Sequence, residues 1–511
     1  MNRGAMLMVA SWTAVSLAGC SVGMNYESSD PASGDEGSVT MGAQAGGGGR
    51  RSAQALDRSQ VPAVGEPRSL DLPEIQDYTL ESGMRVILVE RDALPLVSLE
   101  LQFRGGATAH PAAQAGLAAL TADMVDEGTE SRSALDIADA VDLLGASLSS
   151  TAGYDASQLR LSVLRARFPE ALGILADVVI RPSFPEEDLQ RVVRERVARV
   201  VQRSDVPAAL ADDAFARVLY GDDHPYGVSL LGSRESLESL TRDDVVAYHQ
   251  ARYKPGQATL IVVGDVTRED LDALLGDAFA GWTGSGVDAP APAVVASNAT
   301  RTIYLVDKPG AAQSEVRVGR VAVARDTDAY YPLSVMNTVL GGSFTSRLNS
   351  KLREEKGYTY GAGSFFDMRR VPGPFEASAA VATPVTDSAV VDFVAEIERL
   401  SREAVPATEL ERAKNYMALR LPQRFESLDD VVRRVSELVL YDVSLDFYGG
   451  YVDGVQGVGE ADVRRVADTL LPVGAMAIVI AGDRAVIEEP LKALGLGPVV
   501  VLEPGRPISQ E

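Results

Sequence analysis

The sequence has little of several residue types that carry chemistry or long-range contacts. It contains one cysteine, three histidines and two tryptophans in 511 residues. A single cysteine excludes an intrachain disulfide. Basic residues are outnumbered, 48 against 72 acidic ones, and the formal net charge of −24 argues against nucleic-acid binding, which needs Lys and Arg against phosphate. Beyond the N-terminus, no apolar run is long enough to cross a bilayer.

The three histidines, His110, His224 and His249, stand apart from one another in the sequence. None is at metal-ligand spacing from another His, Cys or acid. We therefore expect each to be a surface or packing residue rather than a metal ligand.

The single cysteine, Cys20, closes an N-terminal export signal. Arg3 is followed by the mostly apolar segment from Ala5 to Leu17, and Leu17–Cys20 reads LAGC. This tetrapeptide resembles the bacterial lipobox, which implies a signal peptide over residues 1–20 and a lipid-bearing mature N-terminus at Cys20. Ser21, rather than Asp, at the next position predicts an exported lipoprotein that, if the source is Gram-negative, is anchored to the outer membrane and faces the periplasm.

Composition and a repeat divide the rest of the chain. Residues 21–67 are rich in Gly, Ser, Ala and Asp, which predicts a disordered tether. A low-complexity linker at 284–300 separates residues 68–283 from 301–500. Helix-opening prolines and strand-ending Gly-Asp pairs recur about 220 residues apart: Pro185 and Pro406, Gly264 and Gly482. We predict an α+β fold with two homologous α/β-sandwich domains.

Periodicity locates the main elements of both halves. Alternating or continuous apolar runs predict strands, and apolar residues three and four apart predict helices. The predicted strands are 78–90 (a hairpin), 96–103, 159–163, 258–263, 302–306, 315–318 and 477–480. The predicted helices are 115–126, 133–144, 168–179, 184–202, one capped at Thr241, 330–340 and one opened at Pro406.

The stretch from Leu340 to Phe366 carries the candidate site. A helical run from Ser346 to Lys356 ends at Gly357, and the sequence Tyr358-Thr359-Tyr360 favours the start of a strand. Arg353 and Tyr360 lie on either side of this corner, where a cation and a phenol could polarise one carbonyl oxygen. The alternative is that Arg353 pairs with Glu354, Glu355 or solvent and that both tyrosines pack.

A series of short motifs over about residues 74–498 resembles the pitrilysin/insulinase (inverzincin) family of zinc peptidases. The first-half motifs are Arg104-Gly105-Gly106, Gly116-Leu117-Ala118, Gly128-Thr129, His224-Pro225-Tyr226-Gly227, Tyr253-Lys254-Pro255 and Val263-Gly264-Asp265. The second-half motifs are Gly341-Gly342, Ser346-Arg347-Leu348 and Leu352–Gly357. Each motif alone is weak, and their combination is specific.

The chain departs from this family at the metal site. The family places H-x-x-E-H on its first helix, where two histidines bind zinc and the Glu acts as base. The matching positions here run from Ala119 to Asp123, with Ala122 in place of the Glu. The third ligand, a Glu on a later helix, would fall near Ala198 and Arg199, with Glu195 about one turn away. We expect no metal in this chain.

The resemblance also implies a role without zinc. In two-chain members of the family, one subunit carries H-x-x-E-H and the other supplies an Arg and, seven residues later, a Tyr, which Arg353 and Tyr360 match. This implies a subunit of a heteromeric metalloendopeptidase, inactive alone, whose zinc resides in a homologous partner and whose substrates are peptides or unfolded segments. The alternative is a non-enzymatic binding or assembly protein of the same fold.

Overall fold

The computed structural model describes residues 65, 67, 74–296 and 300–503. Cys20, the signal peptide and nearly all of the predicted tether lie outside this range. The described residues belong to one compact unit. None of the helices in the described part combines the length and apolarity needed to span a bilayer.

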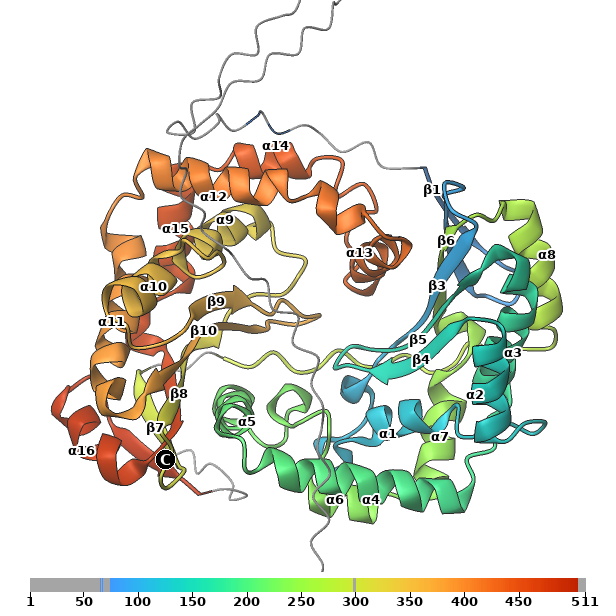
Figure 1. Cartoon of the computed structure of the whole chain (residues 1–511), viewed down its shortest axis with the longest axis horizontal. Helices are drawn as coiled ribbons and strands as arrows, with labels where there is room; N and C mark the ends of the chain where they lie inside the picture. The colour runs from blue at the N-terminus through green and yellow to red at the C-terminus, as the bar shows by residue number, and fades with distance from the viewer. Residues whose placement is uncertain (1–64, 66, 68–73, 297–299, 504–511) are drawn as a thin grey trace, which may run out of the picture. The chain divides into compact units, whose positions relative to one another are not determined.

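Two six-stranded mixed sheets form the framework (Figure 1). The first, in the order β1-β2-β6-β3-β5-β4, consists of β1 Ile75–Thr79, β2 Arg85–Glu90, β3 Leu96–Arg104, β4 Ser147–Ala152, β5 Ala156–Leu164 and β6 Ala258–Gly264. The second, in the order β12-β7-β11-β8-β10-β9, consists of β7 Thr302–Asp307, β8 Gln313–Val321, β9 Ala362–Phe366, β10 Pro374–Ala382, β11 Ala477–Gly482 and β12 Val499–Leu502.

The two sheets repeat one another. Strands β2-β6-β3-β5-β4 and β7-β11-β8-β10-β9 have the same order, and the pairs β2/β6 and β7/β11 are both parallel. The outer strand differs, because β1 pairs antiparallel with β2 whereas β12 pairs parallel with β7. The prediction of two repeated α+β domains is confirmed.

Helices pack against both sheets, joined by short 3₁₀ turns. In the first half they are α1 Leu117–Met124, α2 Ala134–Leu143, α3 Phe168–Ile180, α4 Glu186–Arg203, α5 Pro207–Tyr220, α6 Arg234–Ser239, α7 Arg242–Arg252 and α8 Arg268–Ala278. In the second they are α9 Tyr330–Leu340, α10 Arg347–Asn349, a π-helix at Ser350–Glu355, α11 Thr386–Arg402, α12 Ala407–Leu419, α13 Leu428–Leu440, α14 Tyr451–Gln456, α15 Glu460–Leu470 and α16 Arg484–Ala493.

Local signals account for the starts of several helices. Capping boxes begin α2 at Ser133, α7 at Thr241 and α13 at Ser427, where each hydroxyl accepts from the backbone three residues on. Pro185 and Pro406 are the N-cap residues of α4 and α12. The predicted helix over 330–340 is confirmed with those bounds.

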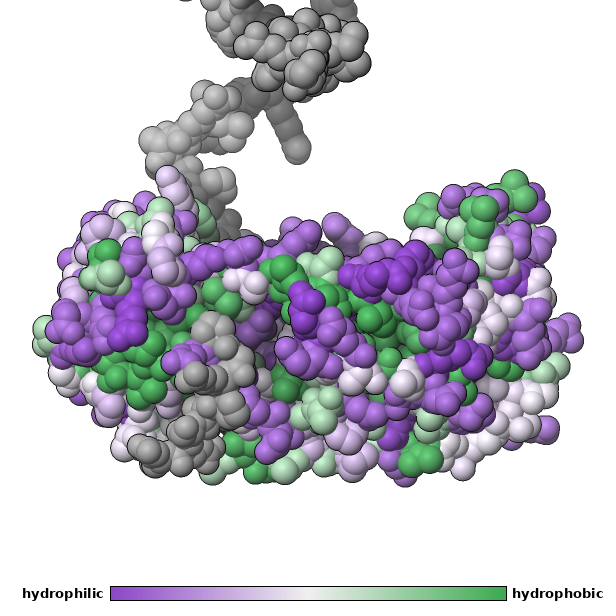
Figure 2. Space-filling model, turned by 90° about the horizontal axis from the view of Figure 1, so that it is seen from below, coloured by the Kyte–Doolittle hydropathy of each residue, from purple (hydrophilic) through white to green (hydrophobic). Residues whose placement is uncertain are grey.

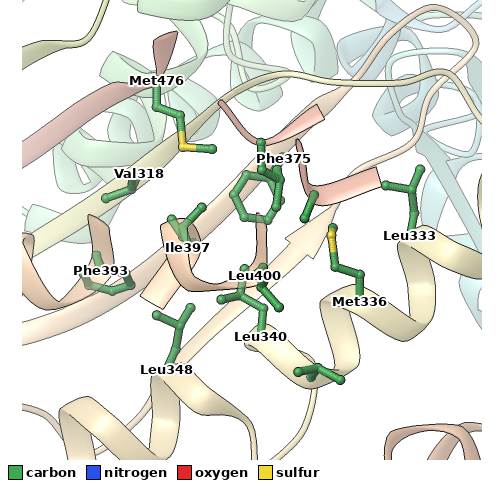
Figure 3. Packing of buried hydrophobic residues seen from close by; sticks show 14 of the residues in the cluster. Val318, Leu333, Met336, Leu340, Leu348, Phe375, Phe393, Ile397, Leu400 and Met476 are labelled. Atoms are coloured by element: carbon green, nitrogen blue, oxygen red, sulfur yellow. The ribbon is translucent and has the colours of Figure 1, made fainter. Parts of the chain in front are cut away.

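The second-half core follows from helical spacing. Leu333, Met336 and Leu340 project from one face of α9 and are fully buried, as is Phe375 of β10 (Figure 3). Leu348 and Leu352, predicted to share a helix face, are also fully buried. They fix the segment that carries Arg353 against this core.

Two helices cross between the halves. α5, from the first half, packs on β8 and β11 of the second sheet, and α13, from the second half, packs on β3 and β6 of the first (Figure 1). Neither helix was predicted from the sequence. Valines at positions 431, 432, 435 and 439 form the buried stripe of α13.

One predicted strand start is wrong. Tyr358–Tyr360 is irregular, and β9 begins only at Ala362. The Gly361 N–H donates to Thr359 Oγ1 at 3.1 Å, and that hydroxyl donates to the Gly361 carbonyl at 2.9 Å. This local hydroxyl-to-backbone turn competes with strand pairing and overrides the β propensity of the three residues.

The visible surface of the molecule is largely hydrophilic (Figure 2). On the face shown in Figure 2, hydrophilic residues predominate and hydrophobic residues gather in separate patches. A charged surface of one dominant sign favours solubility and disfavours contact with polyanions.

Candidate functional site

Arg353 is carried by a short π-helix rather than by a regular α-helix. The Lys356 N–H donates to the carbonyl of Lys351, five residues back, at 3.1 Å. Gly357 follows with φ +65°, the left-handed conformation that ends a helix, as predicted. π-turns within helices are often found at functional sites.

Buried polar contacts hold this segment in place. Arg347 forms a bidentate ion pair with Glu409 of α12, both N–O distances being 2.9 Å. Asn349 donates to the Phe344 carbonyl at 2.6 Å and accepts from the Ala362 N–H at 3.2 Å. The side chain of Asn349 therefore joins the preceding loop to the first residue of β9.

The Arg353 guanidinium lies over an aromatic ring. Its central carbon is 4.5 Å from the centroid of Phe344, a cation–π contact that orients the guanidinium plane. Nη1 approaches Glu354 Oε1 at 3.2 Å without hydrogen-bond geometry. Phe344, which is 67% exposed, was not among the predicted site residues; the signal in the sequence was an aromatic residue two positions after Gly342.

The two tyrosines of the corner differ in environment. Tyr360 is 94% exposed, whereas Tyr358 is partly buried against the second-half core. The alternative considered for this corner therefore holds for Arg353, which contacts Glu354, and for Tyr358, which packs. It does not hold for Tyr360, whose ring is available to another molecule.

An ion pair stands at the positions matching the metal site. Asp123 of α1 binds Nη1 of Arg196 from α4, and Arg196 is 3% exposed. Ala119 and Ala122 offer no ligating atoms, and the Thr121 hydroxyl donates to the Leu117 carbonyl. A guanidinium is thus paired with the one carboxylate of this segment, so these residues do not fit a zinc ion.

The position expected for the third ligand is displaced. Ala198, Arg199 and Glu195 are exposed on α4, and Glu195 contacts Arg191 at 3.1 Å. Arg196, rather than the Ala198–Arg199 pair, is the α4 residue that contacts Asp123. Among the described residues, no group of three or more His, Cys, Asp or Glu side chains is arranged to hold a metal ion.

The two acids that follow Asp123 in the sequence, Asp126 and Glu127, have different environments. Glu127 accepts from Arg191 at 2.5 Å. Burial, followed by the nearby charges of Glu127 and Asp123, raises the pKa of Asp126 to about 6.

All three histidines are buried packing residues, as predicted, each 8% exposed. His249 Nε2 bonds the Val179 carbonyl at 2.9 Å, and burial lowers its pKa to about 4. His224 accepts from the Tyr226 N–H and bonds the Ala293 carbonyl through Nε2. Burial also lowers the pKa of His110, whose Nδ1 contacts the Pro111 carbonyl.

Comparison with known families agrees with this geometry. Residues 85–221 match the model described as insulinase, peptidase family M16, and residues 239–417 match the model described as the peptidase M16 inactive domain. The chain belongs to the M16 family. The predicted resemblance is confirmed, and the inactive-domain match includes Arg353 and Tyr360.

Relatives and solved structures support the assignment. An uncharacterized zinc protease of Mycobacterium tuberculosis is 29% identical over 342 residues, 66% of this chain and 77% of the relative. One of Bacillus subtilis is 24% identical over 70% and 87%. A crystal structure of a peptidase M16 inactive domain from Pseudomonas fluorescens has a TM-score of 0.74 at 26% identity, covering 84% of this chain and all of that one. A protease structure from Helicobacter pylori, at 19% identity, shares the fold, with a TM-score of 0.75.

The Asp123–Arg196 pair predicts how a zinc site could be rebuilt. The combination Ala119→His, Asp123→His and Arg196→Glu places two histidines four apart opposite a carboxylate, so about one zinc per chain is expected by elemental analysis after dialysis. The two histidine substitutions alone should retain less than about 0.1 zinc, because the guanidinium remains and repels the cation.

Arg199 provides the matched control. Arg199→Glu in place of Arg196→Glu adds the same charge on an exposed face of α4, and this triple variant should not hold zinc. If the Arg199 variant binds zinc and the Arg196 variant does not, the Asp123–Arg196 contact does not mark the metal position.

Proposed function

We propose that this chain is the subunit without zinc of a heteromeric M16 peptidase, and that Arg353 and Tyr360 act on the substrate held by a zinc-bearing homologous partner. The observation that carries the proposal is a contrast between two sites. The positions that match the metal site hold a partly buried ion pair, while Tyr360 is exposed and the Arg353 guanidinium lies over the ring of Phe344. A protein that served only as a scaffold would not need an exposed Tyr360 or an Arg353 guanidinium held against Phe344.

The chemistry assigned to this chain is stabilisation of an oxyanion. Attack on a peptide carbonyl transfers negative charge to its oxygen, and the partner's zinc site would supply the attacking water. The Arg353 guanidinium and the Tyr360 hydroxyl would donate hydrogen bonds to that oxygen. A preorganised donor of this kind lowers the barrier by about 2.7–4 kcal/mol.

The proposed location is the periplasmic face of the outer membrane. Cys20 would carry the lipid anchor, and residues 21–67 would give the body reach from the membrane. Mass spectrometry of the mature N-terminus tests this assignment. A chain that still begins at Met1, or an unmodified Cys20, would exclude it.

The proposal predicts a specific loss for Tyr360→Phe. The ring is retained and only the hydroxyl donor is lost, so stability should change little. In the complex with a partner bearing H-x-x-E-H, turnover of an unstructured peptide should fall by about 10²–10³. Most of the loss should be in kcat, because the donor binds most strongly as charge develops in the transition state.

Two variants define the interpretation. Tyr358→Phe makes the same chemical change on the partly buried ring and should be nearly neutral. Arg353→Lys should lose activity sharply, since a flexible ammonium does not replace a planar guanidinium. If turnover falls with Tyr358→Phe and not with Tyr360→Phe, the donor is Tyr358 and the assignment of Tyr360 is wrong. Full activity in all three variants would support the assembly role instead.

A further inference from the structure

A polar cavity of about 520 Å³ lies in the second half, beside the elements that carry the candidate site. Its walls come from α9, the end of β9, the end of α12, α13 and α14 (Figure 1). Its volume is within the range of pockets that hold small ligands or single residues of a peptide.

The cavity is positively charged within a strongly acidic protein. Three arginines, Arg325, Arg420 and Arg424, line it together with two carboxylates, Asp367 and Glu437. Since the whole chain carries a formal charge of −24, this local excess of cations is unusual for its surface. Such an excess in a concave site favours an anionic ligand.

Both lining carboxylates are already paired. Asp367 Oδ2 accepts from Arg369 Nε and Nη2 at 2.8 and 2.6 Å. Glu437 accepts from Arg325 Nε at 3.0 Å and from Arg434 Nη1 at 3.2 Å. Neither carboxylate is therefore left to neutralise the remaining arginines of the cavity.

Arg420 and Arg424 form no ion pair with any residue that the structure describes. The Arg420 guanidinium bonds the Tyr416 hydroxyl and lies 4.8 Å from the centroid of that ring. Arg424 lies in the 3₁₀ turn Pro422–Phe425 that follows α12 and is partly exposed. Guanidinium groups of this kind bind carboxylates with two parallel hydrogen bonds.

The cavity adjoins the strand that follows Tyr360. β9 is the outermost strand of its sheet, and Phe365 and Phe366 at its end line the cavity with Gly342 of the loop that carries Phe344. Phe365 is the fifth residue after Tyr360, so their Cα atoms are at most about 18 Å apart. A peptide held at Tyr360 could therefore reach the cavity within about five or six extended residues.

We propose that this cavity binds a carboxylate of the peptide substrate, through Arg420 and Arg424. The carboxylate is either the C-terminus of the peptide or an Asp or Glu side chain. This inference rests on the proposed function, which identifies the ligand as a peptide. It adds a preference for substrates that carry a negative charge several residues from the bond that is cut.

The test uses binding to this chain alone, without a partner or cleavage. Four dye-labelled decapeptides of Gly, Ser and Ala are compared by fluorescence anisotropy: a free acid, its C-terminal amide, and amides with one internal Glu or Gln. At least one carboxylate peptide should bind about tenfold more tightly than its neutral match, the effect of one charge-assisted hydrogen bond. The free-acid and Glu arms distinguish the two sources of the carboxylate.

The double variant Arg420→Gln/Arg424→Gln should abolish this preference and bind all four peptides alike. Arg412→Gln, which removes a charge from the exposed face of the same helix α12 outside the cavity, is the matched control and should retain it. Equal binding of charged and neutral peptides by the wild type, or a preference that survives in the double variant, overturns the proposal. Because no turnover is measured, this result is independent of the role of Tyr360.

Discussion

The reciprocal packing of α5 and α13 is the contact on which the two halves depend. Each sheet is covered on one face by a helix from the other half of the chain. On the first sheet, Ile87, Val89, Ile261 and Val263 meet the valine stripe of α13, and all of these side chains are at most 4% exposed. Burying each such side chain stabilises the fold by about 1.5–3 kcal/mol relative to leaving it in water, so neither half is complete alone.

A polar network fixes the position of α13 along the first sheet, beside the apolar contact. Glu100, fully buried on β3, accepts from Arg160 at 2.8 Å and from the Ser436 hydroxyl of α13. Gln102 also donates to that hydroxyl, at 2.7 Å. A buried carboxylate needs these partners, so α13 is fixed in one position. α13 also contributes Glu437 to the arginine-lined cavity, and Tyr441 directly after the helix lines it too, so the same helix takes part in the inter-half contact and in the cavity wall.

The positions that match the family's metal motif hold an ion pair between two helices. In place of zinc, Arg196 joins α1 to α4 through Asp123. Removing one partner of such a pair leaves a poorly solvated charge on the other, a loss of about 3–5 kcal/mol when both are buried and less here, since the Asp123 side chain is 31% exposed. The ion pair therefore links α1 to α4.

Local sequence signals predicted much of this structure, and non-local contacts account for what they missed. Caps and apolar periodicity located α9, the helix end at Gly357 and the buried positions Leu348 and Leu352. The same signals do not indicate which sheet a helix covers. They therefore could not predict that α5 and α13 each pack on the sheet of the other half. The contact of Arg196 with Asp123 was not predicted, because arginine is not a metal-ligand residue type. The ligand position was expected near Arg199, three residues later. The prediction that Tyr358–Tyr360 starts a strand was wrong, because the hydrogen bonds of the Thr359 hydroxyl to the backbone of Gly361 outweighed the β propensity of these residues.

The most direct test of the central claim is a titration of turnover. A fixed amount of the zinc-bearing homologue is mixed with increasing amounts of this chain, and cleavage of an unstructured peptide is measured. The account predicts negligible turnover for either protein alone and a rise to a plateau at a fixed ratio of the two. Full turnover by the zinc-bearing chain alone, or chelator-sensitive cleavage by this chain alone, would contradict it.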